Sequence, residues 1–263
     1  MSRFAIKLKN VSKRFGKQWI FQDINLDIPL RSIMIITGSN GSGKSVLLKL
    51  IAGLYQPTLG TRIANISSLS FAPDYLPEEL SLTVQEYIDT IYLMNKKSIT
   101  LKEMALQIQY LGLKPYLLYK VKDCSKGTRQ KINILQALVK PCDVLIFDEP
   151  FSGLDKNTKS YLANKLSELA ETKTIILTNH EADVTFNQML QTYNIETQHK
   201  EYQDIGNPLY KTIIFESQTI PTFKEGVLIT LYDNRYSIQI EAAHLNKILF
   251  YLIQQNSTII EVK

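Results

Sequence analysis

The sequence predicts an α/β fold in which short buried strands lead into amphipathic helices. The apolar run at residues 33–37 is followed by residues 46–54, which carry apolar side chains at helical spacing. Four apolar residues at 144–147 run directly into two carboxylates, as expected where a buried parallel strand ends at a ligand-binding crevice. These stretches together indicate a core with a mixed sheet covered by helices.

The segment between the first strand and its helix fits the phosphate-binding pattern G-x-x-x-x-G-K-[ST]. Its residues, with the one that follows, are Gly38, Ser39, Asn40, Gly41, Ser42, Gly43, Lys44, Ser45 and Val46. The glycines permit positive φ, and free N–H groups at the helix N-terminus face an anion. Lys44 is expected to reach the β and γ phosphate oxygens, and Ser45 to hold Mg²⁺. The sequence therefore predicts a bound nucleoside triphosphate, against the competing interpretation of a Gly- and Ser-rich turn.

Length and composition narrow the protein class. The 263 residues allow one large α/β domain with a small appendix, and they exclude two ATPase domains in one chain. No run approaches the roughly 18 apolar residues of a membrane span, and the N-terminus is too polar for a secretory signal. The net charge of +5 and the basic N-terminal segment are interpreted as a solvated strand face, so no nucleic-acid partner is expected. These features predict a cytoplasmic protein.

A second phosphate-chemistry motif follows the apolar run at residues 144–147. Asp148 and Glu149 come directly after that run, in a Walker B pattern. Asp148 is expected to hold Mg²⁺ through its water shell, and Glu149 to polarise the water that attacks the γ-phosphate. The alternative is a strand followed by an acidic turn. Because a phosphate-binding loop is also present, we favour catalysis, with Glu149 as the base.

A capped helix is predicted shortly before this second motif. Ser125 is a candidate N-cap, and apolar residues at helical spacing follow it from Ile132 onwards. Gly127 lies in the first turn, where N–H groups and the positive end of the helix dipole can face a phosphate. In isolation the same pattern describes any capped helix.

The order of these motifs resembles that of the nucleotide-binding subunits of ABC transporters. Phe15 matches the aromatic residue that stacks on adenine in that family. Residues 152–155, Ser-Gly-Leu-Asp, look like its D-loop, and His180 follows an apolar strand like its switch histidine. The resemblance covers about residues 4–205 and implies a P-loop ATPase core with ATP and Mg²⁺ as cofactors.

The resemblance also implies a composite site. In the family two subunits dimerise head to tail, so that the P-loop of one and the signature helix of the other enclose each ATP. Ser125 and Gly127 would then reach the γ-phosphate, Asp155 would lie at the interface, and His180 would sense the γ-phosphate. Phe15 would contact adenine, although it is also compatible with a core position.

Two departures from the family pattern affect details. Asp74 stands where the family has the Q-loop glutamine, and it is a candidate ligand for Mg²⁺ or its water. The alternative is that Asp74 only shapes a turn between Pro73 and Pro77. Residues 124–128 match the signature Leu-Ser-Gly-Gly-Gln only at its second and fourth positions. This variant looks like one found in bacterial exporter ATPases, which favours export.

The domain organisation follows from a change of pattern after about residue 205. Residues 1–205 are expected to form the ATP-binding domain, with an inserted helical subdomain at about residues 76–138. Residues 206–263 read as strands, one helix and a last strand, which predicts a small C-terminal α+β extension. Dimer stabilisation is the role we expect for it.

The resemblance implies two partners. One is a second ATP-binding subunit, either another copy of this chain or a close paralogue. The other is a transmembrane permease subunit, whose short cytoplasmic helix would enter a groove beside the helical subdomain. Tyr75, Leu76 and Tyr87 are candidates for that groove, with a core role as the alternative. The predicted function is ATP hydrolysis on the inner face of the cell membrane that powers export of a peptide, lipid or drug-like molecule.

Two other functions remain compatible with the sequence. A soluble ABC ATPase that remodels a macromolecular assembly would carry the same motifs. A nucleotide-dependent regulator that hydrolyses ATP weakly is compatible with Asp74 and with the altered signature, although Lys44, Asp148, Glu149 and His180 argue against it.

Overall fold

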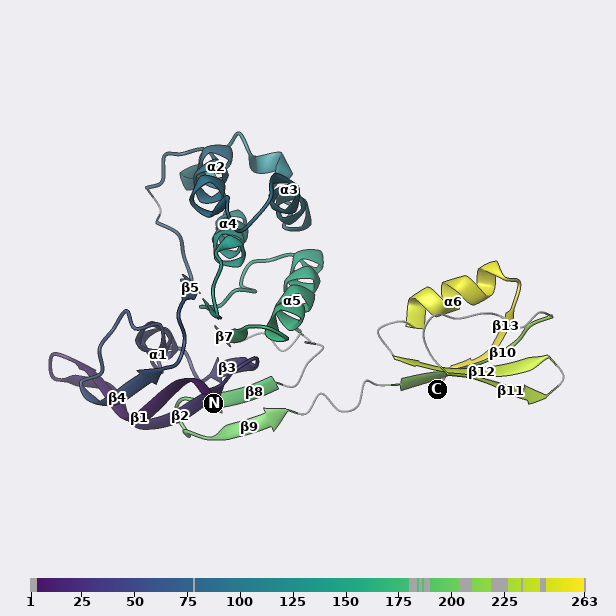
Figure 1. Ribbon diagram of the computed structural model, residues 1–263, viewed down its shortest axis with the longest axis horizontal. Coiled ribbons are helices and arrows are strands. Elements are labelled where there is room, and N and C mark those ends of the chain that lie inside the picture. The colour runs from purple at the N-terminus through teal and green to yellow at the C-terminus, as the bar shows by residue number, and fades with distance from the viewer. Residues whose placement is uncertain are drawn as a thin grey trace. The chain divides into compact units, whose positions relative to one another are not determined.

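The structure is a computed structural model, and it divides into two compact units, Met1–Gln203 and Asp204–Lys263 (Figure 1). Each unit is considered by itself below. The residues that the structure describes are 4–77, 79–179, 184, 186, 190–203, 210–218, 227–232, 234–241 and 245–262. Among them, no helix is long and apolar enough to cross a membrane.

A six-stranded sheet with the order β5-β6-β7-β3-β8-β9 forms the centre of the first unit. All neighbouring strands pair in parallel except β9, which is antiparallel to β8. The strands are β3 (Ile33–Thr37), β5 (Leu69–Ala72), β6 (Val144–Phe147), β7 (Thr174–Thr178), β8 (Leu190–Asn194) and β9 (Lys200–Gln203). Every residue of β6 and β7 is buried, as expected for parallel strands with both faces covered.

A second, antiparallel sheet with the order β2-β1-β4 covers one side of this core. Its strands are β1 (Phe4–Phe15), β2 (Gln18–Pro29) and β4 (Leu59–Ala64). The helix α1 (Lys44–Ile51) shares one apolar cluster with both sheets, which includes Leu47 and Leu50 of α1, Ile6 of β1 and Ile36 of β3. The sheet and the helix thus fix the segment that joins β3 to α1 from two sides.

Two longer helices follow the central strands. The helix α4 (Lys126–Val139) packs against β5, and α5 (Lys156–Ala170) packs against β7. Ser125 caps α4 by accepting a hydrogen bond from Thr128 N–H (3.1 Å), and Asp155 caps α5 by accepting one from Thr158 N–H (2.9 Å). The starts of both helices are therefore fixed by the side chains that the sequence places there.

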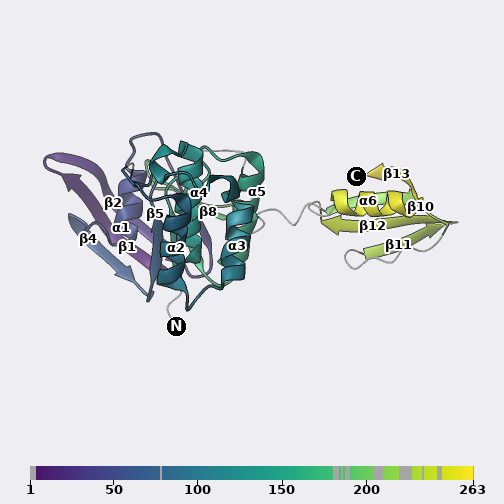
Figure 2. The ribbon, with the colours of Figure 1, turned by 90° about the horizontal axis from the view of Figure 1, so that it is seen from above.

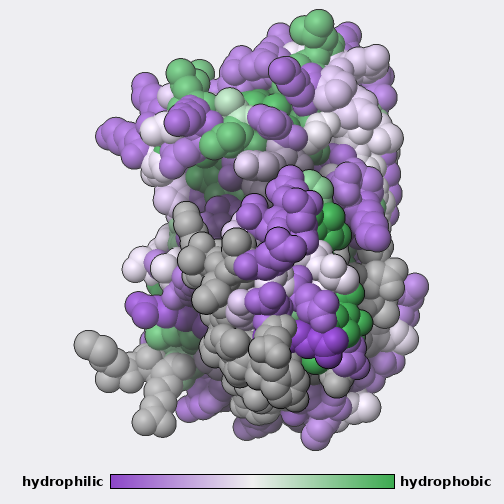
Figure 3. Space-filling view, turned by 90° about the vertical axis from the view of Figure 1, so that its right-hand side faces the viewer, coloured by the Kyte–Doolittle hydropathy of each residue, from purple (hydrophilic) through white to green (hydrophobic). Residues whose placement is uncertain are grey.

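A helical arm stands on this core, at the top of Figure 1. It contains α2 (Val84–Asn95), α3 (Leu101–Tyr110) and two single-turn 3₁₀ helices at Lys114–Tyr116 and Val121–Asp123, and it packs against α4. Both longer helices begin with a capping box, formed by Thr83 with Glu86 and by Thr100 with Glu103. In Figure 3 hydrophobic side chains stand among hydrophilic ones at this end of the molecule.

The second unit is a four-stranded antiparallel sheet with one helix on it (Figure 2). Its elements are β10 (Tyr210–Glu216), β11 (Val227–Tyr232), β12 (Arg235–Glu241), α6 (Leu245–Gln254) and β13 (Thr258–Val262), in the sheet order β11-β12-β10-β13. Ile248 and Leu252 of α6 pack on Phe215 and Ile238 of the sheet. The one helix expected within residues 206–263 is observed as α6.

The burial of α6 leads to a first prediction. Leu252 is fully buried, so Leu252→Ala should destabilise the second unit by about 2–5 kcal/mol, whereas its neighbour Ile253, which is 61% exposed, should tolerate alanine within about 0.5 kcal/mol. Two signals distinguish the units during urea unfolding. Fluorescence reports the first unit alone, because the only tryptophan, Trp19, lies in its strand β2, whereas circular dichroism reports both units. We expect Leu252→Ala to shift part of the dichroism transition and leave the Trp19 fluorescence transition in place. An equal shift of both signals would mean that the units do not unfold independently.

Candidate nucleotide-binding site

Parallel pairing brings the predicted phosphate-chemistry residues to one edge of the central sheet. The adjacent strands β5, β6, β7 and β3 all run in the same direction. Asp74 follows β5, Asp148 and Glu149 follow β6, and Gly38 begins the loop after β3. Residues from three separate parts of the chain therefore share the carboxyl edge of the sheet, where open α/β sheets bind ligands.

At two positions of the loop between β3 and α1, both the positive φ and the lack of room for a Cβ atom require glycine. Gly38 has φ of 147°, and a Cβ there would lie 2.7 Å from Ile195 Cγ2. Gly43 has φ of 97°, and a Cβ there would lie 2.5 Å from Ile20 Cγ2. The loop is thus pressed against its neighbours, and its backbone N–H groups at the start of α1 are left to face a ligand.

Lys44 lies along this loop and is only 6% exposed. Its ammonium group donates hydrogen bonds to the carbonyl oxygens of Gly38 (3.0 Å) and Ser39 (2.8 Å). Ser45, the next residue, is exposed at the first turn of α1. The positive charge is therefore held at the loop itself, where it can meet phosphate oxygens.

Glu196 also contacts the loop, and the sequence motifs gave no indication of it. Its carboxylate accepts hydrogen bonds from Ser39 N–H (2.9 Å) and Ser39 Oγ (2.6 Å). These bonds, with the nearby charge of Lys44, lower the pKa of Glu196. Glu196 lies 157 positions from Ser39 in the turn after β8, so only the paired strands β3 and β8 bring the two together.

The end of β6 is organised by a threonine of the neighbouring strand β7. Thr178 Oγ1 donates to Asp148 Oδ1 (2.8 Å) and accepts from Glu149 N–H (2.8 Å). Asp148 is 3% exposed, and Glu149 is half-buried with a positive φ of 48°. A positive φ is costly for a residue with a side chain, and such strain is concentrated at functional sites. Thr178 is a further residue of this site that motif reading did not single out.

Asp74 lies in the loop after β5 with one carboxylate oxygen buried. Within the described residues, its Oδ1 has no hydrogen-bond partner. The described residues contain no group of three or more metal-binding side chains. Mg²⁺ usually takes one or two carboxylates, with substrate oxygens and water completing its octahedron. The buried oxygen of Asp74 and the buried carboxylate of Asp148 fit that ion.

The starts of α4 and α5 form a second group of predicted residues. A Cβ added to Gly127 would collide with the carbonyl oxygen of Gly153, so these two glycines allow the two helix starts to touch. Asp155 accepts a hydrogen bond from Lys131 Nζ (2.6 Å), which, with the bond from Thr158 N–H, lowers the pKa of its carboxyl well below the usual range. In the isolated chain Asp155 therefore pairs with its own α4.

Two further predicted residues have different outcomes. Phe15, at the end of β1, is 45% exposed, so it is not a core residue. Its ring contacts Tyr55 edge to face, with 5.6 Å between ring centroids, and Lys13 Nζ lies 5.0 Å from its ring centroid. An exposed aromatic face is available there for stacking on a base. His180 lies outside the described residues.

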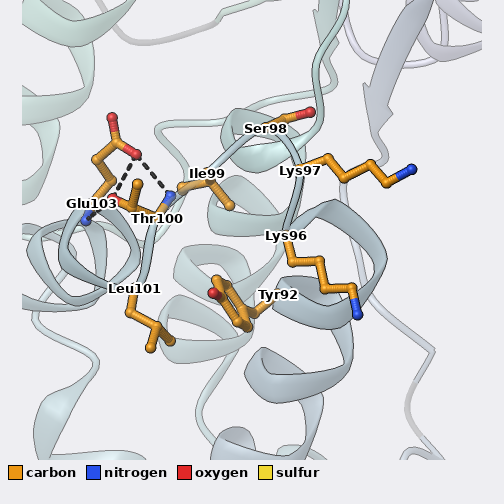
Figure 4. A pocket seen from close by; sticks show the side chains of 8 residues that line it. All are labelled: Tyr92, Lys96, Lys97, Ser98, Ile99, Thr100, Leu101 and Glu103. Carbon is orange, nitrogen blue, oxygen red and sulfur yellow. Dashed lines mark hydrogen bonds between the residues drawn. The ribbon is translucent and has the colours of Figure 1, made fainter.

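A pocket of about 380 Å³ at the turn between α2 and α3 is separate from these groups (Figure 4). It is lined by side chains that include Tyr92, Lys96, Lys97 and Leu101. None of the residues that line it was predicted to contact the nucleotide. The candidate nucleotide site therefore does not include this pocket.

Comparison with known proteins identifies the family. A family model described as "ABC transporter" matches residues 21–152, about half of the chain. The chain belongs to the ABC transporter family. The matched region contains the loop from Gly38 to Ser45, Asp74, Ser125 and Glu149, whereas Phe15 and Asp155 lie outside it.

Relatives agree with this assignment. The zinc import ATP-binding protein ZnuC of Hydrogenovibrio crunogenus is 31% identical over 176 residues, which cover 63% of this chain and 68% of that protein. The manganese transport system ATP-binding protein MntB of Bacillus subtilis is 28% identical over 194 residues, covering 68% of this chain and 78% of that protein. A solved dimer of the ATP-binding cassette MJ0796 with ADP and Pi has a TM-score of 0.60 at 24% identity, and it covers 74% of this chain and 97% of that one.

These findings establish the coarse function. The protein has the P-loop α/β fold of ABC cassettes, and it is an ATPase that uses ATP with Mg²⁺ and powers a transmembrane partner. The expectation of an exporter finds no support, because the relatives described above are named for zinc import and manganese transport. That expectation rested on the variant signature sequence.

The contact between Gly127 and Gly153 generates a second prediction. Helix propensity alone would make Gly127→Ala stabilising by about 0.5–1 kcal/mol, but the clash with the backbone oxygen of Gly153 reverses the sign. We expect a net destabilisation of about 1–3 kcal/mol in urea unfolding followed by Trp19 fluorescence. Lys126→Ala, at the exposed neighbouring position, is the matched control and should change little. A more stable Gly127→Ala variant would contradict the close contact.

The ion pair of Asp155 generates a third prediction. The folded-state pKa of Asp155 is depressed, so the pair stabilises the fold above the unfolded-state pKa of about 3.9 and is lost as the pH falls through the folded value. Asp155→Asn keeps a good N-cap but removes the charge. The stability difference between wild type and Asp155→Asn should be constant above about pH 5 and shrink below about pH 4. In a Lys131→Met background most of that pH dependence should disappear, and its full persistence would contradict the pairing.

Proposed function

We propose that this chain is the ATPase subunit of an importer, in which two copies enclose two ATP molecules and drive a membrane permease. The observation that carries the proposal is the convergence of Lys44, Asp74, Asp148 and Glu149 at the carboxyl edge of one parallel sheet. Their chemistry is that of phosphoryl transfer, which needs a cation cradle, metal-binding oxygens and a base for water.

Each residue at the carboxyl edge of the sheet is assigned one role in ATP binding or hydrolysis. The N–H groups of Gly41, Ser42, Gly43, Lys44, Ser45 and Val46 hold the phosphates. The Lys44 ammonium exchanges its carbonyl partners in the loop for phosphate oxygens. Ser45, Asp148 and Asp74 hold Mg²⁺, which when bound neutralises charge on the phosphate oxygens. Phe15 stacks on the adenine, and Ser39 and Asn40 complete the loop.

Glu149 is the proposed base for the attacking water. Its backbone is fixed from two sides, because its N–H donates to Thr178 Oγ1 and its carbonyl accepts from Gln130 Nε2 (3.1 Å). Fixing the backbone at both atoms limits where the carboxylate can go. A base positioned in this way contributes typically a factor of about 10²–10⁴ to the rate.

The second group of residues completes the site of a partner copy. Ser125 and Gly127 at the start of α4 offer the N–H groups of a capped helix to the γ-phosphate bound by the partner. Asp155 bonds to Lys131 of the same helix α4, which supports a role for Asp155 at the same interface. His180 is assigned the role of γ-phosphate sensor from the family resemblance alone.

The permease is proposed to dock beside α2. A cavity of about 230 Å³ lies there between β5, α2 and α4, and its lining includes the apolar Phe71, Ile91 and Met94 with Gln136 and Lys140. Among the predicted docking residues, Tyr87 bonds to Gln136, a residue of that lining, and Tyr75 is 67% exposed. Leu76 is 4% exposed and belongs to the core. A short helix with an apolar face suits this groove.

The direction and cargo are proposed from the relatives. ZnuC and MntB carry zinc import and manganese transport in their names, so we propose uptake of a divalent transition-metal ion. The chain is placed on the inner face of the membrane, where its permease holds it. We also propose that the ATP-binding domain ends near residue 205, and that the second unit contributes to dimer stability.

The role of Glu149 gives a fourth prediction. Glu149→Gln should lower the ATPase rate by about 10²–10⁴ while the affinity for ATP stays within about twofold, because the amide keeps the shape but cannot take a proton. ATP affinity is measured by equilibrium binding of a fluorescent ATP analogue. Lys44→Ala is the contrasting variant, which should lose binding itself. Full turnover by Glu149→Gln would remove Glu149 from the reaction.

A membrane pull-down tests the wider proposal. Tagged wild type and Glu149→Gln are recovered from native membranes in Mg-ATP, and copurifying proteins are identified. Cells carrying Lys44→Ala are compared with wild type for uptake of radioactive Zn²⁺ and Mn²⁺. A copurifying polytopic protein with reduced metal uptake supports the proposal. Recovery of soluble partners alone would favour an assembly-remodelling ATPase, and unchanged metal uptake would refute the proposed cargo.

A further inference from the structure

Three amide side chains, two of them buried and one half-buried, form a stripe along α4. Gln130, Asn133 and Gln136 are spaced three residues apart, so they lie on one side of the helix. Gln130 is 3% exposed and Asn133 is fully buried. Burying an amide is unfavourable unless its hydrogen bonds are made inside the protein. Each of these side chains makes such bonds. Their partners lie in three different places: the residue after β6, the loop after β5, and α2.

The bonds of two of these amides form a chain with one direction. Tyr87 of α2 donates its hydroxyl to Gln136 Oε1 (2.6 Å), Gln136 Nε2 donates to Asn133 Oδ1 (2.7 Å), and Asn133 Nδ2 donates to the carbonyl oxygen of Pro73. The Pro73 carbonyl can only accept, so Asn133 must turn its Nδ2 to Pro73 and its Oδ1 to Gln136. Gln136 then donates through Nε2 to Asn133 and accepts the hydroxyl of Tyr87 at Oε1.

This chain of hydrogen bonds connects the proposed docking groove with the proposed nucleotide site. Near its Tyr87 end, Gln136 lines the cavity proposed for the permease helix. At the other, the Pro73 carbonyl is part of the peptide bond to Asp74, whose Oδ1 is buried without a partner among the described residues. Gln130, one turn earlier on α4, holds the backbone of Glu149. One helix face therefore touches the docking groove, the Asp74 loop and the end of β6.

We propose that Tyr87, Gln136 and Asn133 are positioning residues, which form a hydrogen-bonded relay that sets Asp74 for Mg²⁺ according to the state of the docking groove. This inference rests on the proposed function of the Asp74 loop and of the groove. A permease helix that moves Tyr87 or Gln136 also shifts Asn133, which is bonded to Gln136. The hydrogen bond from Asn133 to the Pro73 carbonyl then changes, and the adjacent Asp74 carboxylate moves with it. Cooperative hydrogen bonds in a low-dielectric interior make such a chain sensitive to the loss of one member.

The structure contains a matched bond outside the relay. Tyr161 of α5 donates its hydroxyl to Gln107 Oε1 of α3, also at 2.6 Å and also between two helices. Tyr161→Phe removes the same kind of bond as Tyr87→Phe, but among the described residues neither Tyr161 nor Gln107 has a hydrogen bond to the Asp74 loop. A merely structural role predicts the same result for the two variants, whereas the relay predicts different ones.

The readout is the Mg²⁺ requirement of nucleotide binding rather than turnover. The full chain is titrated with Mg²⁺ at a saturating concentration of a non-hydrolysable ATP analogue, and thermal stabilisation is recorded. Asn133→Ala should raise the Mg²⁺ concentration at half effect by about threefold to tenfold, the factor that one net hydrogen bond is worth. Tyr87→Phe should raise it by about twofold to fivefold. Tyr87→Phe removes a single hydroxyl and is the milder change, so it can still test the relay if Asn133→Ala does not fold.

A double-mutant cycle shows whether the effect passes through Asp74. If Asn133 acts by placing Asp74, then Tyr87→Phe or Asn133→Ala added to Asp74→Asn should raise the Mg²⁺ requirement no further. Additive effects, or a shift with Tyr161→Phe equal to that with Tyr87→Phe, would overturn the relay. The proposed nucleotide site is tested separately. If wild type binds the analogue in a metal-dependent way and Lys44→Ala abolishes this binding, the site is supported even if the relay fails.

Discussion

Parallel pairing of β5, β6, β7 and β3 is the constraint on which the site depends. Because β6 and β7 are buried along their whole length and β3 along most of it, the order and direction of the strands are fixed by packing rather than by contacts at the site itself. The loops that leave their carboxyl ends can then vary in sequence without losing their common position. This separation allows the loop after β5 to carry Asp74 without disturbing the sheet.

Local patterns were sufficient for the parts of the site that a single segment builds. The loop before α1 was predicted because strand, glycines and helix follow one another, and the two carboxylates after β6 were predicted for the same reason. The caps Ser125 and Asp155 were also predictable, since a cap acts on its own helix. In each case the deciding interactions span only a few residues of sequence.

The remaining parts depend on contacts between distant segments, and no local pattern encodes them. Glu196 meets Ser39 only because β3 and β8 are neighbours, and Thr178 orders Asp148 only because β6 and β7 are. Asn133 reads as an ordinary polar residue of a helix until its partner in another loop is known. The expectation of export rested on a short variant motif and finds no support among the relatives, and such a motif carries little information about a partner that the chain does not contain.

The left-handed backbone of Glu149 has a consequence for how the protein can be improved. Glycine adopts φ near 48° without penalty, so the residue with the best local stability at this position is one with no side chain and no chemistry. A selection for thermal stability alone would therefore drift towards glycine and an inactive ATPase. Stability and turnover oppose each other at this one residue, and any screen that stabilises the protein needs activity as a second criterion.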